Sequence, residues 1–369
     1  MVLEDLALLF TRGIGSRGAA HLIEYFGSAE ALFAATRNEL VEGAGLRSDL
    51  AERILRREGM PAAKKEVEYC RKHNIVALAA TDREYPATLR EATDRPHVLF
   101  VQGNIEALSK RALAMVGTRE ASPTGLHACD MLIGGLASHL DDIAIVSGLA
   151  YGIDAACHRA ALNHKLSTIA VVASTLPEVT PAPHRALADD ILRNGGAIVS
   201  ELNSHTHHNG TYFIARNRII AALAMGTVVV ESPATGGSLA TADMADSYGR
   251  VVMAVPGRLT DSSSFGSNNL IRSHKARLVL TATDIIEDMA WDVHQNRDRD
   301  NSISEDKDIA SLTTEQQAVY AAFDTSAIVD WPTLIDATGL SLGELAMVVM
   351  DLELAGLIRS LPGKRYERV

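Results

Sequence analysis

The residues of this chain that are best suited to chemistry are three arginines placed close to glycines. Arg216 and Arg218 lie in "ARNR", directly before an apolar helical stretch, and Arg119 lies in "VGTREASPTG". Guanidinium groups bind phosphate oxygens through paired, charge-assisted hydrogen bonds. Residues two positions apart point to nearly opposite sides of a helix. Arg216 and Arg218 can therefore both face one ligand only if they lie at the start of the helix. In the alternative arrangement, one of them binds the ligand and the other braces the loop.

Four loops carry the glycines and hydroxyl groups that an anion site needs. They are "VGTREASPTG" (116–125), "SGLAYGID" (147–154), "ARNR" (215–218) and "SPATGGSLATA" (232–242). Glycine lets backbone amides approach a ligand closely, and the free amides of helix N-termini favour anions. The loops predict a phosphate cradle made of Gly117, Thr118, Arg119, Ser147, Gly148, Gly152, Arg216, Arg218, Gly237 and Ser238.

The class of phosphate ligand follows from the motifs that are missing. "SGLAYGID" lacks the G-x-G-x-x-G spacing of dinucleotide-binding loops, and no G-x-x-x-x-G-K-[ST] segment occurs in the chain. An arginine-rich cradle without a lysine–magnesium motif suits a phosphodiester backbone or a small nucleotide. We therefore expect no cofactor and no metal.

The elements that must position these loops alternate from about Arg111 onward. Short apolar runs predict strands at "LAMVG", "IAIVSG", "TIAVVA", "AIVSE", "TVVVES", "VVMAVPG" and "RLVL", and helical stretches such as "IDAACHRAALNH" lie between them. Continuous apolar runs are typical of strands that are covered on both faces. The pattern predicts an α/β fold with a doubly wound, mostly parallel, Rossmann-like sheet. Its ligand site should lie outside the carboxyl ends of the strands.

Further segments flank this region. Residues 1–80 are predicted to form short helices, with two similar segments, "GIGSRGAAHLIEYF" and "GAGLRSDLAERIL", in which Gly-x-Gly precedes an amphipathic helix. Such hairpins can hold a backbone phosphate, but a packing module is favoured because Lys and Arg do not outnumber Asp and Glu there. Residues 81–290 hold the Rossmann-like domain and residues 291–310 a polar linker. Residues 311–369, with three helices and a terminal hairpin, predict a winged helix.

Composition limits the compartment and the partners. The chain has 369 residues, 47% of them apolar, and a formal net charge of −11. That charge argues against general coating of nucleic acid but leaves room for a local basic pocket. No apolar run is long enough for a membrane span, and acids stand where a secretory signal needs basic residues. Three widely spaced cysteines predict buried thiols. We expect a soluble, cytoplasmic protein.

Eight motifs in order make the chain resemble the DNA-processing protein A family (DprA, also called Smf). They are "YPATL", "VGTREASPTG", "SGLAYGIDAACHRAAL", "GGAIVSE", "ARNRIIA", "GGSLATADMA", "VVMAVPG" and "NNLI". The resemblance implies an extended Rossmann fold, with a helical N-terminal domain of helix-hairpin-helix type and a C-terminal winged helix. It implies a homodimer that binds and protects single-stranded DNA in a basic pocket and helps to load the RecA recombinase during natural transformation. It also adds Asn217 to the DNA-binding residues.

The chain departs from the family pattern at the outer wall of the pocket. Relatives have Gly-x-Gly-Leu-Asp, then Tyr-Pro and often a basic residue, where this chain reads "ASTLPEVTPA"; they have Gly-Ala where it reads Lys-Ala in "LIRSHKARLV". Arg185 is the nearby basic candidate for DNA binding. These departures do not touch Arg119, Arg216 or Arg218. They change residues of the outer wall of the pocket and of part of the possible dimer edge. They fall at Ala173, Thr175, Thr180, Ala182 and Lys275.

Other chemistries have weaker support. Asp154 and His158 have a helical spacing that suits acid–base work or metal binding, but no nucleophile or third ligand is near them in sequence. "HTHHNG" (205–210) could ligate a metal, or protonated histidines could add charge beside a phosphate. Glu201 and Glu231 end neighbouring strands, which would suit glycosidic hydrolysis; bonding to loop amides or to an arginine is favoured.

The leading hypothesis is a single-stranded-DNA-binding protein that is not an enzyme. The alternative is a nucleotide hydrolase similar to the lysine-decarboxylase-like phosphoribohydrolases. Those proteins share the general fold and carry a Pro-Gly-Gly-x-Gly-Thr loop near a catalytic acid. Here the corresponding "ATGGSLATAD" lacks that proline and has Leu-Ala in place of Gly-Thr.

The predicted winged helix has few of the charges that a DNA reader needs. From Ser311 to Ile358 there is no Lys or Arg. The acids of this stretch are Glu315, Asp324, Asp330, Asp336, Glu344, Asp351 and Glu353, and cations return only at Arg359, Lys364, Arg365 and Arg368. Because a recognition helix on DNA needs cations for the phosphates, a protein partner is the favoured ligand of this domain.

Overall fold

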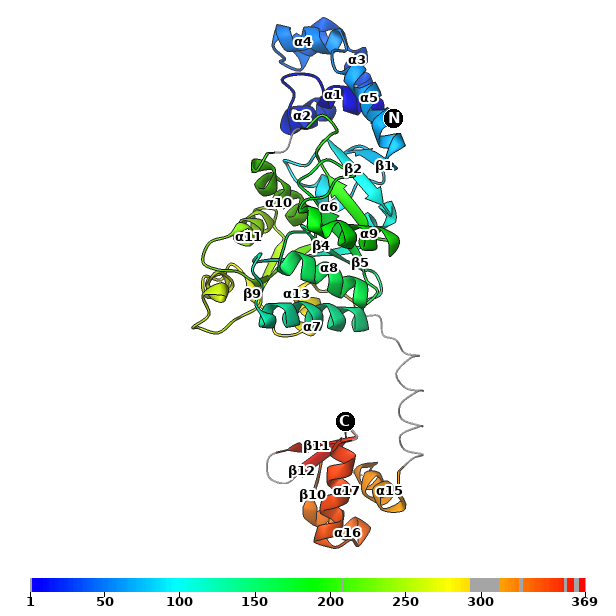
Figure 1. The fold of residues 1–369 in the computed structure, drawn as a ribbon, viewed down its shortest axis with the longest axis vertical. Coiled ribbons are helices and arrows are strands. Elements are labelled where there is room, and N and C mark those ends of the chain that lie inside the picture. The colour runs from blue at the N-terminus through cyan, green and yellow to red at the C-terminus, as the bar shows by residue number, and fades with distance from the viewer. Residues whose placement is uncertain are drawn as a thin grey trace. The chain divides into compact units, whose positions relative to one another are not determined.

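Contacts divide the chain into two compact units, residues 1–294 and 295–369 (Figure 1). The structure, a computed structural model, describes residues 2–206, 209–292, 312–324, 328–354, 357–361 and 365–368. The further division of the first unit at residue 80 stays a prediction.

The first unit alternates helices and strands after a helical start. Its helices are α1 (Val2–Leu9), α2 (Ser16–Phe26), α3 (Ala29–Ala34), α4 (Ser48–Leu55), α5 (Met60–Lys72), α6 (Ala87–Arg90), α7 (Pro123–His139), α8 (Ile153–Asn163), α9 (Arg185–Arg193), α10 (Thr211–Leu223), α11 (Gly237–Ser247), α12 (Phe265–Arg272) and α13 (Ala282–Asp288). Its strands are β1 (Ile75–Ala79), β2 (Val98–Gly103), β3 (Arg111–Gly117), β4 (Ile143–Ser147), β5 (Ser167–Val171), β6 (Ala197–Ser200), β7 (Gly226–Glu231), β8 (Val251–Ala254) and β9 (Arg277–Leu278).

One sheet holds all nine of these strands, in the order β1-β2-β6-β5-β4-β3-β7-β8-β9. Strands β3 to β9 pair in parallel, as the apolar runs predicted. The region before Arg111 adds β1 and β2, which pair antiparallel with each other, and β2 also pairs antiparallel with β6. These two strands were not predicted, although their sequences, IVALA and VLFVQG, are apolar runs like those of the predicted strands.

Helices cover both faces of the sheet, which confirms the doubly wound prediction. Side chains of β3 alternate between the faces. Ala112, Ala114 and Val116 lie in one buried cluster with residues of α10, α11 and α12. Leu113 and Met115 lie in the opposite cluster with residues of α7, α8 and α13. The loops at the carboxyl ends of the strands are thereby held between two rigid layers.

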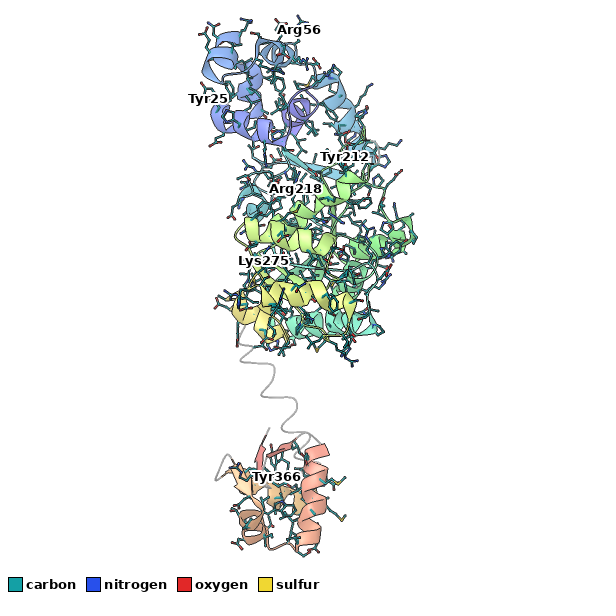
Figure 2. The ribbon with its side chains drawn as sticks, turned by 90° about the vertical axis from the view of Figure 1, so that its left-hand side faces the viewer. Tyr25, Arg56, Tyr212, Arg218, Lys275 and Tyr366 are labelled. Carbon is teal, nitrogen blue, oxygen red and sulfur yellow. The ribbon has the colours of Figure 1, made fainter. Side chains whose placement is uncertain are left out.

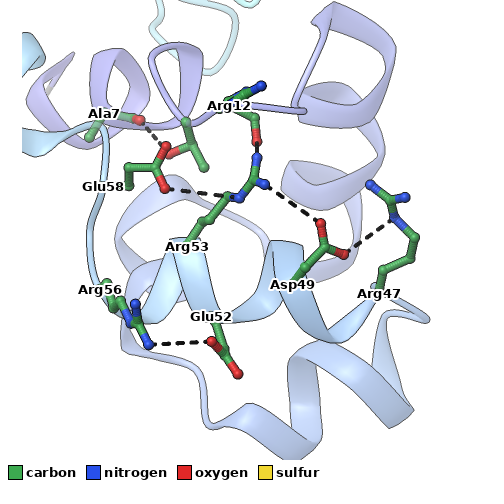
Figure 3. Close-up of polar contacts among 9 residues, drawn as sticks. Ala7, Arg12, Arg47, Asp49, Glu52, Arg53, Arg56 and Glu58 are labelled. Carbon is green, nitrogen blue, oxygen red and sulfur yellow. Dashed lines mark hydrogen bonds and ion pairs between the residues drawn. The ribbon is translucent and has the colours of Figure 1, made fainter.

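The N-terminal helices pack against the β2–β6 side of the sheet and satisfy their own charges. Leu6 and Leu22 share a buried cluster with Phe100 of β2. Figure 3 shows Arg53, whose Nη1 donates to the Arg12 carbonyl at 2.9 Å, within an array of ion pairs. The pairs are Arg53 with Asp49 and Glu58, Arg47 with Asp49, and Arg56 with Glu52. These contacts tie α4 to the segment between α1 and α2.

The three cysteines are buried free thiols, as predicted. Among the described residues, no single helix combines the length and hydrophobicity of a membrane span. The pair Trp331–Thr338 and Leu342–Glu353 meets both criteria together, with a bend of 106° at the break.

The second unit is a winged helix, as predicted. It consists of α15 (Thr314–Ala321), β10 (Ile328–Asp330), α16 (Trp331–Thr338), α17 (Leu342–Leu354), β11 (Ile358–Leu361) and β12 (Arg365–Arg368). The strands form an antiparallel sheet in the order β10-β12-β11. The core of this unit is formed by buried residues of its three helices, among them Val319, Leu334, Leu345 and Leu352.

Candidate functional site

A cavity of about 260 Å³ opens at the carboxyl ends of β3 and β7, between α10 and α11. β3 has β4 on one side and β7 on the other, so the cavity lies where the winding of the sheet reverses. Open α/β sheets bind their ligands at this point. The predicted site residues that line the cavity are Gly117, Thr118, Arg119, Arg216, Asn217, Gly237 and Ser238.

Three other predicted residues lie behind the cavity wall. The Ser147 hydroxyl is fully buried and donates to the Met115 carbonyl at 2.7 Å. A side chain at Gly148 would collide with the guanidinium of Arg216, and one at Gly152, whose φ is +73°, would collide with the Thr118 carbonyl. These glycines serve close packing of the loop against the arginine, which is a structural use of glycine.

Arg216 is 6% exposed and braces the loops. Its Nη1 donates to the carbonyls of Gly148 and Val171, which follow β4 and end β5. The nearby Asp154 carboxylate accepts hydrogen bonds from the amides of Gly148 at 3.1 Å and Ala150 at 3.4 Å. Burial lowers the pKa of Arg216 and raises the pKa of Asp154, and the charge of each opposes the shift of the other. The two residues form one buried, mutually compensated charge network.

Asn217 connects this network to α11. Its Oδ1 accepts from Arg216 Nε at 3.2 Å, and its Nδ2 donates to the Gly237 carbonyl at 3.2 Å. The N-cap Gly236 leaves the first turn of α11 without a side-chain cap. Because Gly236, Gly237 and Ser238 line the cavity, the positive end of the helix dipole faces it.

Arg119 is the cation that remains available at the mouth. Its side chain is exposed, and among the described residues it has neither a hydrogen bond nor an ion pair. The guanidinium carbon lies 5.8 Å from the centre of the Phe213 ring, a cation–π contact. Ile214, which is 62% exposed, lines the same cavity. The mouth therefore joins a free cation to aromatic and aliphatic surface.

The structure places the other two predicted arginines elsewhere. Arg218 is ion-paired with Glu201, whose pKa is raised by burial and lowered by this arginine. It lines a separate cavity. Arg185 belongs to α9, where it pairs with Asp189 at 3.1 Å and donates to the Pro177 carbonyl at 2.9 Å. Neither side chain lines the cavity of Arg119.

Four of the five departures from the family pattern line a further cavity of about 460 Å³, at the ends of β5 and β6, whereas Lys275 lies elsewhere and pairs with Asp243. Its walls include Ala173, Thr175, Thr180, Ala182 and Glu178. No Lys or Arg lines it among the described residues. This part of the edge is therefore polar rather than basic.

The alternative chemistries find no working geometry in the described residues. His158 is fully buried, its Nδ1 lies 2.7 Å from Thr168 Oγ1, and burial lowers its pKa to about 3, so the ring is neutral. The Glu231 carboxylate accepts from the Ser122 amide at 2.9 Å. No cluster of three metal-ligating side chains occurs in the described ranges, and His207 and His208 lie outside them.

Sequence reasoning missed the apolar part of the mouth. Phe213, Ile214, Pro233 and Thr235 line the cavity but were not among the candidates. A signal was present, because Phe213 lies three residues before Arg216 and therefore on the same side of α10. Phe213 was missed because the candidate residues were chosen for charge, backbone freedom or hydroxyl groups.

The comparisons with known proteins agree on one family. A family model described as DNA recombination-mediator protein A matches residues 76–290, and one described as DprA winged helix domain matches residues 304–364. A putative DNA processing protein DprA of Mycobacterium tuberculosis is 38% identical over 258 residues, which are 68% of this chain and 64% of that protein. Protein Smf of Escherichia coli is 33% identical over 88% of this chain and 85% of its own length.

Two solved structures are also similar. The X-ray structure of DNA processing protein A from Streptococcus pneumoniae has a TM-score of 0.67 and 31% sequence identity, and covers 78% of this chain and 97% of its own. DNA processing protein A from Helicobacter pylori, described for its single-stranded DNA binding mode, has a TM-score of 0.53 and 26% identity, and covers 60% of this chain and 97% of its own.

Proposed function

The chain belongs to the DNA recombination-mediator protein A family (DprA/Smf), and from this premise we propose that it binds single-stranded DNA in the cavity of Arg119. The observation that carries the proposal is the unpaired, exposed Arg119 beside Phe213, at the mouth of a cavity that receives the N-terminus of α11. A cation and helix amides suit the phosphate, and an aromatic ring suits a base. The single-stranded DNA binding named for the Helicobacter pylori relative supports the same ligand.

The proposed role is binding rather than catalysis. Asp154 is the one carboxylate that lines the cavity among the described residues, and loop amides and Arg216 already engage it. A phosphoribohydrolase would need a free acid near the ligand. Release of base from nucleoside monophosphates, measured beside strand binding, separates the two functions.

The wider proposal follows from family membership. We infer a homodimer in the cytoplasm that protects incoming single strands and helps to load RecA onto them during natural transformation, without a cofactor. In this proposal residues 1–80 and 81–290 act together on the strand. Residues 291–310 connect them to the winged helix of residues 311–369, which takes part in protein interaction.

We expect at least about tenfold tighter binding of a single strand than of matched duplex at the same moderate salt, because the cavity needs an unpaired base for stacking. Fluorescence anisotropy with a labelled 20-nucleotide strand, free or annealed, measures both affinities. Equal affinities at every salt concentration would contradict the proposed function.

Deleting residues 311–369 is expected to leave single-strand affinity within about twofold of the full chain, because a unit with no cations from Ser311 to Ile358 has no groups for phosphates. The same anisotropy titration measures it. Neutralising Lys364, Arg365 and Arg368 in the full chain is the matched control for the terminal hairpin. Loss of binding in a truncated protein that remains folded would make the hairpin a DNA contact.

A further inference from the structure

A second cavity, of about 500 Å³, lies near the C-terminal end of α11. Its walls come from α2, α10, α11 and the segment after α6. Met244, Ser247 and Thr93 line it beside the polar residues. The side chains with charged or phenolic groups are Arg17, Glu91, Asp94, Arg218, Tyr248 and Arg250.

Two helices connect this second cavity to the first. On α10, Arg216 and Asn217 line the first cavity and Arg218 lines the second. On α11, Gly237 lines the first and Tyr248, the C-cap, lines the second. Eleven residues of helix span about 16 Å. A single strand that advances roughly 3.4 Å or more per nucleotide covers that distance with about five nucleotides or fewer.

The interior of the second cavity holds two ion pairs and one further carboxylate. Arg250 pairs with Glu91 at 2.7 Å, and Arg218 pairs with Glu201. The Tyr248 hydroxyl donates to Asp94 at 2.7 Å. Arg250 Nε is buried and has no hydrogen-bond partner among the described residues. An interior with an aromatic ring, hydrogen-bond donors and acceptors, and a carboxylate that repels anions suits a nucleobase better than a phosphate.

Arg17 adds a positive charge at this cavity. It lies in the first turn of α2, it is exposed, and no ion pair or hydrogen bond engages it in the described parts of the chain. Burial and Asp94 raise the pKa of Tyr248, whereas Arg218 and Arg17 oppose that shift, so both guanidinium groups act on the phenol. Figure 2 shows Arg218 on α10, close to the N-terminal helices that carry Arg17.

We propose that this cavity is a second nucleotide subsite for the same DNA strand, with Arg17 on the phosphate and Tyr248 beside the base. The inference rests on the proposed function and deepens it: a strand seated in the first cavity runs along α10 and α11 to the second. The N-terminal helical segment, through Arg17, then forms part of the DNA-binding surface.

The test is a series of thymidine strands of 2 to 20 nucleotides, titrated by anisotropy against wild type and Arg17→Ala. Wild type should gain affinity once strands reach both cavities. Arg17→Ala should bind the 20-nucleotide strand about fivefold more weakly, with a log-affinity versus log-salt slope smaller by about 0.7, and bind the shortest strand normally. Arg12→Ala is the matched control, because it removes an equally exposed arginine from the same helical segment.

Variants of Tyr248 test the base position separately. Tyr248→Leu should weaken binding of the long strand about tenfold without changing the salt slope, because it removes a base–aromatic stack, and Tyr248→Phe should keep the affinity within about threefold. If Arg17→Ala and Arg12→Ala bind long strands with the same affinity, the second subsite is contradicted. It is also contradicted if Arg17→Ala loses the same factor of affinity for short strands as for long ones. If wild type binds no strand of any length, the proposed function fails instead.

Discussion

Replacing Arg216 with methionine is expected to lower the free energy of unfolding by about 3–5 kcal/mol, because the change leaves the Asp154 carboxylate buried without its counter-charge. Methionine keeps most of the side-chain volume, so the loss reports the charge rather than a cavity. The carbonyls of Gly148 and Val171 also lose their donor. Urea denaturation at pH 7 measures the loss. Single-strand affinity should fall at least about tenfold under conditions where the variant is folded, since the loops are no longer braced.

The Asp154→Asn, Arg216→Met double variant is the matched control for this experiment. Removing both charges of a buried pair is often nearly neutral, and asparagine keeps an oxygen for the amides of Gly148 and Ala150. The double variant should therefore regain at least about 2 kcal/mol of the lost stability and part of the binding. Additive losses in the double variant would show that the two residues do not compensate each other.

Arg119→Ala is expected to weaken single-strand binding by about 10- to 100-fold, the size of a lost charge-assisted contact. Because the side chain is exposed and makes no ion pair in the described structure, stability should change by less than about 0.5 kcal/mol. The salt slope should fall by about 0.7. The measurement is a titration with one strand at several salt concentrations, beside a urea denaturation curve.

One substitution separates charge from shape at Arg119, and a second, on α9, is the control. Arg119→Lys should keep the salt slope while losing part of the affinity, because lysine retains the charge but not the flat group over Phe213. Arg193→Ala removes an exposed arginine of α9 and should bind normally. If Arg119→Ala binds as tightly as Arg193→Ala, Arg119 is not a contact and the proposed site must be moved.

The part of this molecule that sequence could predict is the part governed by local pattern. Continuous apolar runs predicted β3 to β9, and the glycine-rich loops after them predicted the edge where Gly117, Arg119 and Gly237 meet. Parallel strands must end at a common edge, so no tertiary information was needed. Three helical stretches and a terminal hairpin likewise predicted the winged helix.

What sequence could not predict depends on partners that are distant along the chain. Arg216 and Arg218 have the same side chain, yet one braces carbonyls near β4 and β5 and the other pairs with Glu201 after β6. Arg119 is an available cation because no carboxylate pairs with it among the residues that the structure describes. The approach of Arg17 to Tyr248 joins residues 231 positions apart in sequence, through the packing of the N-terminal helices.

The hydrogen bonds of Arg216 also have a consequence for the rate at which a ligand is captured. With the ends of β4 and β5 tied to one buried side chain, the loops need not reorganise when a strand arrives. Association is then limited by diffusion and orientation, at roughly 10⁵–10⁷ M⁻¹s⁻¹ when attraction by charge is weak. Strands of different length should be captured at similar rates, and the difference between them should appear in how long each stays bound.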